Sequence, residues 1–315
     1  MATIQAVTGP IDTGKLGRVL MHEHIITLSP GVIENWPGLW DRETVKQQAI
    51  VKLQDVQRRG IDTLVDLTTV DLGRDVAFVR EIAAGAGVNV IVATGIWWQP
   101  QRYFHSREVD AIADLFVQDI ERGTAGTNIR CGIIKCATDT EGATPPIEKI
   151  LRASARAHRR TGVPISTHTY AAGEMGTVQQ DIFASEGVDL SRVIIGHSGD
   201  SEDLGYLKRL MDRGSSIGMD RFGIDRLLPT DRRVATIAAL CKEGYAGKMV
   251  LSHDASCFSD ARDAETVRRQ WPNWHYNHIP DDVLPALRAQ GVSEAQISQM
   301  LVDNPRRIFE QQGAY

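Results

Sequence analysis

The feature that most constrains the fold of this chain is a repeated alternation of short apolar segments with longer amphipathic ones. Short runs rich in β-branched residues and bounded by Gly or Pro are typical of buried strands. The longer segments have helical spacing, as in the stretch 41–59, whose apolar positions are Val45, Ala49, Leu53 and Val56. Eight strands are therefore expected, at 19–26, 61–68, 88–95, 129–137, 164–169, 192–198, 216–221 and 248–254.

The expected strands alternate with expected helices, at 41–59, 74–84, 107–122, 147–160, 178–185, 203–213 and 231–243, and further helical material includes 293–301. Eight alternations in 315 residues predict the α/β class and a (β/α)8 TIM barrel with C-terminal helices. An open doubly wound sheet is the alternative, and it is disfavoured because no Gly-rich phosphate-binding fingerprint follows an early strand. A barrel of this length is commonly one domain, so we expect a single domain over residues 1–315.

Composition and charge exclude several classes of partner. The net charge is −5 with both signs spread along the chain, and no basic stripe indicates nucleic acid. No apolar run approaches the length of a membrane span, and the N-terminus does not resemble a signal peptide. The four cysteines show no metal-finger or CxxC spacing, so reduced thiols in a cytoplasmic protein are expected.

The first expected strand contains the motif His22-Glu23-His24. Because side chains alternate along a strand, His22 and His24 are expected on the same face. Two imidazoles at that spacing can bind one metal ion. Taken alone, the pair could equally be two solvated histidines at the end of a strand.

Other expected strands also end in side chains that bind metals. In a barrel of this kind the active site lies at the carboxyl ends of the strands. Four of the nine histidines stand at such ends, and an Asp and a Lys join them: His22, His24, Lys135, His168, His197 and Asp254. Convergence of this many ligand types at one opening predicts a metal site.

Lys135 differs from the other five because a charged ammonium cannot bind a cation. A buried charged Lys is costly, whereas the neutral amine is a nucleophile. Reaction of that amine with CO2 would give a carboxylate able to bridge two metal ions. The alternative is a Lys that reaches solvent or pairs with an Asp.

These motifs together resemble the phosphotriesterase family of the amidohydrolase superfamily, and most closely its phosphotriesterase-like lactonase branch. The similarity runs from Gly9-Pro10 to Asn304-Pro305-Arg306-Arg307, and it includes Gly132-Ile-Ile-Lys135 and Ile195-Gly-His197-Ser-Gly-Asp200. The resemblance implies a (β/α)8 barrel with two divalent metal ions, of which zinc is the best match and cobalt, manganese or iron are compatible. It implies that the buried ion is held by His22, His24 and Asp254. It implies that the exposed ion is held by His168 and His197, and that carboxylated Lys135 and a hydroxide bridge the two ions.

The mechanism expected from two bound metal ions is hydrolysis by an activated water. Two cations lower the pKa of a bound water, and Asp254 accepts its proton and can return it to the leaving alkoxide. Asp254 could instead be a ligand without a proton-transfer role. Asp200 is expected to orient a ligand or to relay the proton outward, and the alternative is an ordinary helix N-cap, because Ser201-Glu-Asp-Leu follows it.

The substrate is expected to lie against the loops after the third, seventh and eighth strands. The residues expected to bind it are Trp97, Arg221, Phe222, Cys257 and Trp274, which are mostly apolar and suit an acyl chain or an aryl leaving group. The lactonase resemblance predicts opening of acyl-homoserine lactones or γ- and δ-lactones, with organophosphate hydrolysis as a side activity and quorum quenching as a role. A homodimer is implied by the same resemblance.

One residue departs from the lactonase pattern. Members of that branch usually carry Tyr at the position of Trp97, and Trp there resembles the organophosphate-hydrolysing members. An indole cannot supply a phenol hydroxyl, so a primary phosphotriesterase is the alternative. A barrel that binds a metal and a ligand without turnover is a further alternative, but the complete set of ligands and the proton acceptor argue against it.

Overall fold

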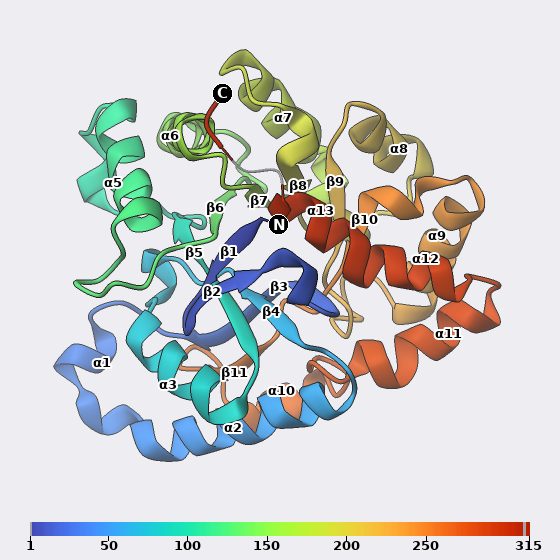
Figure 1. Cartoon of the computed structure of the whole chain (residues 1–315), viewed down its shortest axis with the longest axis horizontal. Helices are drawn as coiled ribbons and strands as arrows, with labels where there is room; N and C mark the ends of the chain where they lie inside the picture. Colours follow the sequence, from blue (N-terminus) through green and yellow to red (C-terminus); the bar gives the residue numbers. More distant parts are fainter. Residues whose placement is uncertain (1, 311–312) are drawn as a thin grey trace.

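The structure is a computed structural model that describes residues 2–310 and 313–315 (Figure 1). Its main sheet has nine strands in the order β10-β9-β8-β7-β6-β5-β4-β3-β11, and each neighbouring pair is parallel. The strands are β3 Val19–Thr27, β4 Thr63–Asp66, β5 Asn89–Gly95, β6 Ile133–Ala137, β7 Ile165–His168, β8 Val193–Ile195, β9 Ser216–Met219, β10 Met249–Leu251 and β11 Ser256–Ser259. The predicted α/β barrel class is confirmed.

The sheet curls on itself, so that its two edge strands, β10 and β11, which are consecutive in the chain, meet. The turn between them runs beside β3, where the Asp254 backbone N–H donates to His22 O at 3.0 Å. One residue later, the His24 N–H donates to Ala255 O at 2.9 Å. The sequence predicted one continuous strand over 248–254, and the structure instead ends β10 at Leu251 and starts a further strand, β11, at Ser256.

Helices surround the sheet, and every expected helix is present within a few residues of its predicted ends (Figure 1). The long outer helices are α2 Arg42–Arg58, α3 Val76–Ala86, α5 Val109–Glu121, α6 Pro145–Thr161, α7 Met175–Ser185, α8 Leu204–Asp212 and α9 Thr230–Lys242. The shorter helices are α1 Val32–Asn35, α4 Arg102–His105, α10 Ala264–Gln270, α11 Leu284–Ala289, α12 Glu294–Ser298 and α13 Asn304–Glu310, and π-helical turns lie at Ile279–Val283 and Gln299–Asp303. Side-chain caps fix several starts, as where Asp41 accepts from the Glu43 N–H at 3.0 Å.

The interior of the barrel is a separate apolar core below the site. Alternate residues of the strands fill it, namely Val19, Met21, Val65, Leu67, Ile91, Ala93, Ile133, Ile194 and Val250. A short antiparallel hairpin, β1 Thr3–Ala6 with β2 Gly9–Asp12, and helix α13 lie across the amino ends of the strands and add Ile4, Ile308 and Phe309 to this core. The hairpin was not predicted, because its two strands are four residues long and only partly apolar. With this end filled, the opening lies at the carboxyl ends.

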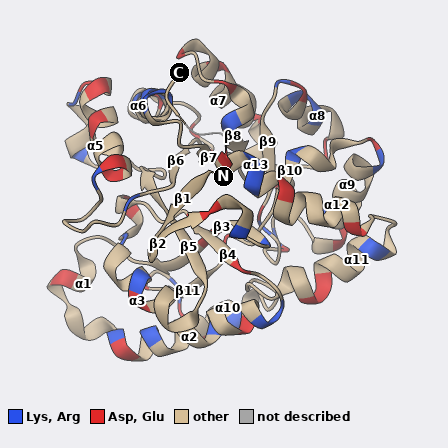
Figure 2. Ribbon diagram, viewed as in Figure 1, with Lys and Arg blue, Asp and Glu red and all other residues tan. Residues whose placement is uncertain are grey.

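Figure 2 shows both basic and acidic residues on the outer helices, in line with a net charge of −5 that is made of both signs. Within the described part of the chain, no helix combines the length and apolar character that crossing a membrane requires.

Replacing Phe309 by Ala is expected to lower the free energy of unfolding by about 3–5 kcal/mol, because it empties a fully buried site at the closed end of the barrel. Denaturant unfolding would measure the change. The control is Leu115→Ala on α5, whose side chain is 37% exposed and whose loss is expected to change stability by about 0.5 kcal/mol or less. Equal effects of the two changes would contradict the role given to the closed end.

Candidate metal centre

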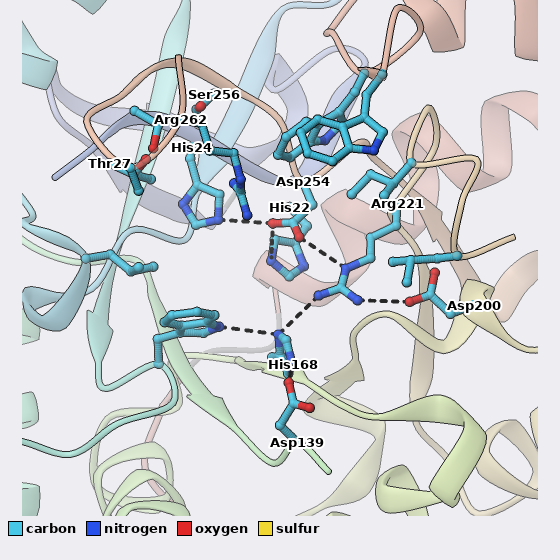
Figure 3. Close-up of a pocket in the computed structure, with 18 of the residues that line it drawn as sticks. His22, His24, Thr27, Asp139, His168, Asp200, Arg221, Asp254, Ser256 and Arg262 are labelled. Atoms are coloured by element: carbon cyan, nitrogen blue, oxygen red, sulfur yellow. Dashed lines mark hydrogen bonds and ion pairs between the residues drawn. The ribbon is translucent and has the colours of Figure 1, made fainter. Parts of the chain in front are cut away.

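Six side chains from five segments meet at the carboxyl end of the barrel, which is where the sequence analysis expected them. Four contacts between these side chains, each made by Asp254 or Lys135 with a histidine, span 2.7 to 3.7 Å. Asp254 Oδ1 lies 3.1 Å from His24 Nε2 and 3.4 Å from His22 Nε2, and Lys135 Nζ lies 2.7 Å from the same His22 nitrogen. His197 Nε2 lies 3.7 Å from Asp254 Oδ2. The His168 ring completes the group, with its centre 4.5 Å from that of His197. Figure 3 shows His22, His24, His168 and Asp254 facing the cavity.

A change of register in β3 lets His22 and His24 face inward. Val19 and Met21 point into the barrel core, so strict alternation would turn His22 outward. The pairing of β3 with β4 shifts between Leu20 and Glu23, and this irregularity changes the phase of the alternation. His22 and His24 therefore share a face, as predicted, but through a bulge that the sequence pattern did not indicate.

His197 and Asp254 reach the site from turns rather than from strand residues. Both have left-handed backbone, with φ of 58° at His197 and 57° at Asp254. β8 ends at Ile195 and β10 ends at Leu251, so each side chain is carried on the turn after its strand. Residues other than Gly adopt this conformation when surrounding contacts hold them there.

Asp220 orients two of the imidazoles, and the sequence analysis did not name it as a site residue. Its Oδ2 lies 2.8 Å from His22 Nδ1, and its Oδ1 lies 2.9 Å from His197 Nδ1. Thr68 Oγ1 does the same for His24, at 2.8 Å from Nδ1. With Nδ1 occupied, each ring presents Nε2 to the centre, which is the usual support of a metal-binding His. The available signal was an acidic residue at the carboxyl end of the seventh strand.

His168 is held the other way round. Its Nε2 lies 2.6 Å from Asp139 Oδ2, while its Nδ1 faces the cavity and lies 3.3 Å from the indole Nε1 of Trp97. Arg221 Nη2 lies 3.4 Å from the same Nδ1. The nitrogen available to a ligand on His168 is therefore Nδ1.

The donor atoms and their protonation fit a divalent metal ion. Ligand atoms of His22, His24 and Asp254 all lie within 4.8 Å of one another. Burial lowers the pKa of His22 to about 4 and that of His197 well below its ordinary value, so both rings are neutral at pH 7. Neutral imidazole and carboxylate are the forms that bind zinc, cobalt, manganese or iron. Asp220 also lies within this distance of His22 and His197, but its oxygens face their Nδ1 atoms.

Lys135 is 1% exposed, so it does not reach solvent. Its strand, β6, places it two residues after Ile133, on the face that points into the barrel. Burial lowers the pKa of the Lys135 amine to about 8, against the opposing charges of Asp254 and Asp220. A sizeable fraction of the amine is therefore neutral in mildly alkaline solution, which is the form that reacts with CO2.

Arg221 connects Asp254 to Asp200. Its Nε donates to Asp254 Oδ2 at 3.2 Å and its Nη1 donates to Asp200 Oδ2 at 2.9 Å, while Arg233 Nη2 lies 2.7 Å from Asp200 Oδ1. The N-cap interpretation of Asp200 is wrong, because Asp203 caps α8 by accepting from the Tyr206 N–H. Because a guanidinium keeps its protons, the Arg221 side chain cannot carry a proton from Asp254 to Asp200. Asp200 therefore orients Arg221.

A cavity of about 760 Å³ opens above these groups. Of the five residues expected to bind substrate, three line it: Trp97, Arg221 and Trp274. Phe222 does not, because its ring is fully buried in the apolar core behind the wall. Cys257 does not either, since β11 turns its side chain away, toward Tyr276 and a neighbouring cavity of about 940 Å³. The expected wall positions of Phe222 and Cys257 are therefore corrected.

Comparison with known proteins places the whole chain among phosphotriesterase-like proteins. The model of the phosphotriesterase family matches residues 2–309. A phosphotriesterase homology protein of Mycobacterium tuberculosis is 50% identical over 325 residues, covering 100% of both chains. An aryldialkylphosphatase of Saccharolobus solfataricus is 38% identical over 303 residues, covering 95% of this chain and 96% of that protein. The solved structure of the phosphotriesterase from Mycobacterium tuberculosis superposes with a TM-score of 0.96 at 49% identity, over 100% of both chains.

The change Asp220→Asn is expected to weaken metal binding by about 10- to 100-fold, because one amide cannot accept from both Nδ1–H groups. Competition with a chromogenic chelator would measure the affinity. The change Asp212→Asn, at an exposed carboxylate that accepts from the Tyr245 hydroxyl at 2.8 Å, is the control and is expected to leave the affinity unchanged. An unaltered affinity in the Asp220 variant would contradict the orienting role.

Reactivation of metal-free protein by metal and CO2 is expected to become faster as the pH rises from 6 to 9, with a midpoint near the Lys135 pKa of about 8. Below that pKa the amine is protonated and unreactive, and about 1% is neutral at pH 6. The measurement is the rate of recovery of ester hydrolysis at constant dissolved CO2. Lys135→Ala should lose metal and activity together and recover in part with short carboxylic acids. A rate independent of pH, or a fully active Lys135→Ala protein, would refute the role of this amine.

Proposed function

This chain belongs to the phosphotriesterase family and is a hydrolase that acts on esters, and we propose that its preferred esters are lactones. The observation that carries the proposal is the form of the cavity wall. The loop 220–229, between β9 and α9, packs against the segment 260–274, where Asn273 Nδ2 donates to Asp225 Oδ2 at 3.3 Å, and the two together line one side of the cavity. Between them they contribute the apolar side chains of Ile224, Leu227, Trp271 and Trp274 to a groove leading outward from the metal ligands, and Arg226 and Arg262 also line it.

Such a groove suits a lactone with an apolar tail. The rim carries two exposed apolar side chains, Tyr170 and Leu227, which are 42% and 46% exposed. Burial of those surfaces against an acyl chain would be favourable. A phosphate triester spreads three substituents around phosphorus and needs three separate subsites, whereas an acyl lactone needs one site for the ring and one groove for the chain.

The metal complement of the proposal is two divalent ions, with zinc first and cobalt, manganese or iron as alternatives. The residues that would hold the buried ion are His22, His24 and Asp254, and those for the exposed ion are His168 and His197, with carboxylated Lys135 between the two ions. Bound there, the ions would supply a lower pKa for the attacking water and polarisation of the ester oxygen.

Asp254 is the proton acceptor in this proposal. Its Oδ1 faces His22 and His24, which leaves Oδ2, on the Arg221 side, to take a proton. Burial opposes ionisation of Asp254, but the surrounding imidazoles and the Arg221 guanidinium outweigh that effect and hold the pKa of Asp254 well below the usual range. The carboxylate is therefore ionised and ready to accept, and it can return the proton to the leaving alkoxide.

Arg221 and Trp97 complete the wall beside this carboxylate. Asp200 and Arg233 hold the Arg221 guanidinium in place from behind, so its charge stays close to the reacting ester. The backbone N–H of Trp97 donates to both oxygens of Asp71 at 3.0 Å, which fixes the indole next to His168. The two side chains are placed to set which acyl groups fit.

Phosphotriester hydrolysis is the second candidate. Two observations favour it: the indole of Trp97 at a position where lactonases usually carry a phenol, and 38% identity to a protein described as an aryldialkylphosphatase. The phosphorus centre would use the same ions and the same proton acceptor. The two activities therefore differ in the groove and share the centre.

A substrate panel tests the proposal. We expect kcat/KM for the best acyl-homoserine lactone, γ-lactone or δ-lactone to exceed that for paraoxon by at least about tenfold, which corresponds to about 1.4 kcal/mol of transition-state binding. A paraoxon value far above every lactone would reverse the ranking. Chelator treatment should abolish hydrolysis and added metal should restore it; hydrolysis that survives metal removal would remove the ions from the proposal.

The change Asp254→Asn is expected to lower kcat by about 10²- to 10⁴-fold, because the amide cannot accept the proton. Metal content must be measured on the same sample. If both ions are retained and kcat is unchanged, Asp254 is a ligand without a proton-transfer role.

The homodimer and the cytoplasmic location expected from the sequence form part of the proposal. Sedimentation of the purified protein at micromolar concentration would test the first, and fractionation of the source cells the second.

A further inference from the structure

Glu23 stands between the two histidines of the His22-Glu23-His24 motif, and its side chain points to the opposite face of β3. We propose that Glu23 is a positioning residue of the metal centre, whose carboxylate holds the turn 252–255 so that Asp254 faces His22 and His24. The proposal rests on the metal centre described above, and it assigns a function to the one member of the motif that is no ligand.

The Glu23 carboxylate is fully buried and accepts four hydrogen bonds from that turn. Oε1 accepts from Ser252 Oγ at 2.9 Å, from the His253 N–H at 3.0 Å and from His253 Nδ1 at 2.7 Å. Oε2 accepts from the Ala255 N–H at 2.9 Å. A carboxylate has about four acceptor positions, so the turn uses its full capacity.

These bonds fix three successive backbone N–H groups on β3. His253 and Ala255 donate to Glu23, and Asp254 between them donates to His22 O. Asp254 has a left-handed backbone, with φ of 57°, a conformation that costs free energy in a residue with a side chain, although less in Asp than in most, so that contacts around it are needed to hold it. The bonds on either side of Asp254 supply that constraint, and they set the direction of its carboxylate.

The same clamp extends to the substrate wall through His253. With Nδ1 donating to Glu23, His253 Nε2 accepts from the Ile279 N–H at 3.0 Å. The indole Nε1 of Trp274 donates to His253 O at 2.9 Å. Glu23 therefore connects a metal ligand, Asp254, to a wall residue, Trp274, within one set of buried contacts.

The test is Glu23→Gln, which keeps the size of the side chain but replaces one acceptor oxygen by a donor. The Nε2 amide group that replaces one oxygen then faces N–H groups from which it cannot accept, and the turn loses its fixed direction. We expect the affinity for Co(II), measured by competition with a chelator, to fall about 10- to 100-fold and the absorption spectrum of the bound Co(II) to change. We expect kcat for the best lactone to fall, because Asp254 is the proton acceptor of the proposed function.

The matched control is Asn304→Ala. Asn304 is buried, and its Nδ2 donates to Ala246 O at 2.8 Å and to Met249 O at 2.7 Å, at the amino end of β10. Its loss should lower the melting temperature while the affinity for Co(II) and the Co(II) spectrum stay as in the wild type. The control separates general destabilisation of this strand from misplacement of Asp254.

A Glu23→Gln protein with wild-type Co(II) affinity and spectrum overturns the proposal, whatever its melting temperature, and leaves the metal centre intact. A wild-type protein that binds no Co(II) overturns this proposal and the proposed function together. If Glu23→Gln does not fold, Glu23→Asp keeps the carboxylate but shortens its reach to the turn. It is expected to shift the Co(II) spectrum in the same direction, and an unchanged spectrum there also overturns the proposal.

Discussion

The hydrogen bonds between β3 and the turn 252–255 close the barrel, and the arrangement of the site depends on that closure. β3 carries His22 and His24, and the turn carries Asp254, so the first and last parts of the sheet meet at the metal ligands. The remaining ligands lie on, or directly after, strands between β3 and β10. A small displacement of one edge relative to the other would separate Asp254 from both histidines. The fold and the site are therefore stabilised by the same contacts.

Burial determines the chemistry of these groups as much as their spacing does. In water His22 would be partly protonated near neutral pH and Lys135 almost wholly so. Within the barrel, loss of hydration lowers both pKa values, and each group presents a lone pair where it would otherwise present a proton. Asp220 and Asp254 remain ionised in the same surroundings because imidazoles and Arg221 lie beside them. The centre thus combines neutral nitrogen donors with anionic oxygen donors before any cation arrives.

The sequence was sufficient to predict the barrel class and the meeting of the six ligand side chains at one opening. The strand ends follow from the apolar runs, and a parallel barrel brings the carboxyl ends of its strands together. It was insufficient where a contact depends on backbone detail. The bulge in β3, the left-handed turns at His197 and Asp254, and the strand β11 have no signature in residue type. Asp220 was missed because a carboxylate that orients imidazoles has the same sequence signal as one that binds a metal. Phe222 and Cys257 were misplaced because a loop residue can face either way.

The hairpin β1–β2 and helix α13 give the barrel a single functional end. Apolar side chains of the described residues fill the space beneath the site, from Ile4 and Phe309 up through the strands. Substrate and product must therefore use the same opening, so a product that leaves after cleavage competes with the next substrate that enters. Release along the groove lined by residues 220–229 and 260–274 would then limit the turnover rate as readily as bond breaking does, and side chains along that groove, far from the reacting atoms, would influence kcat.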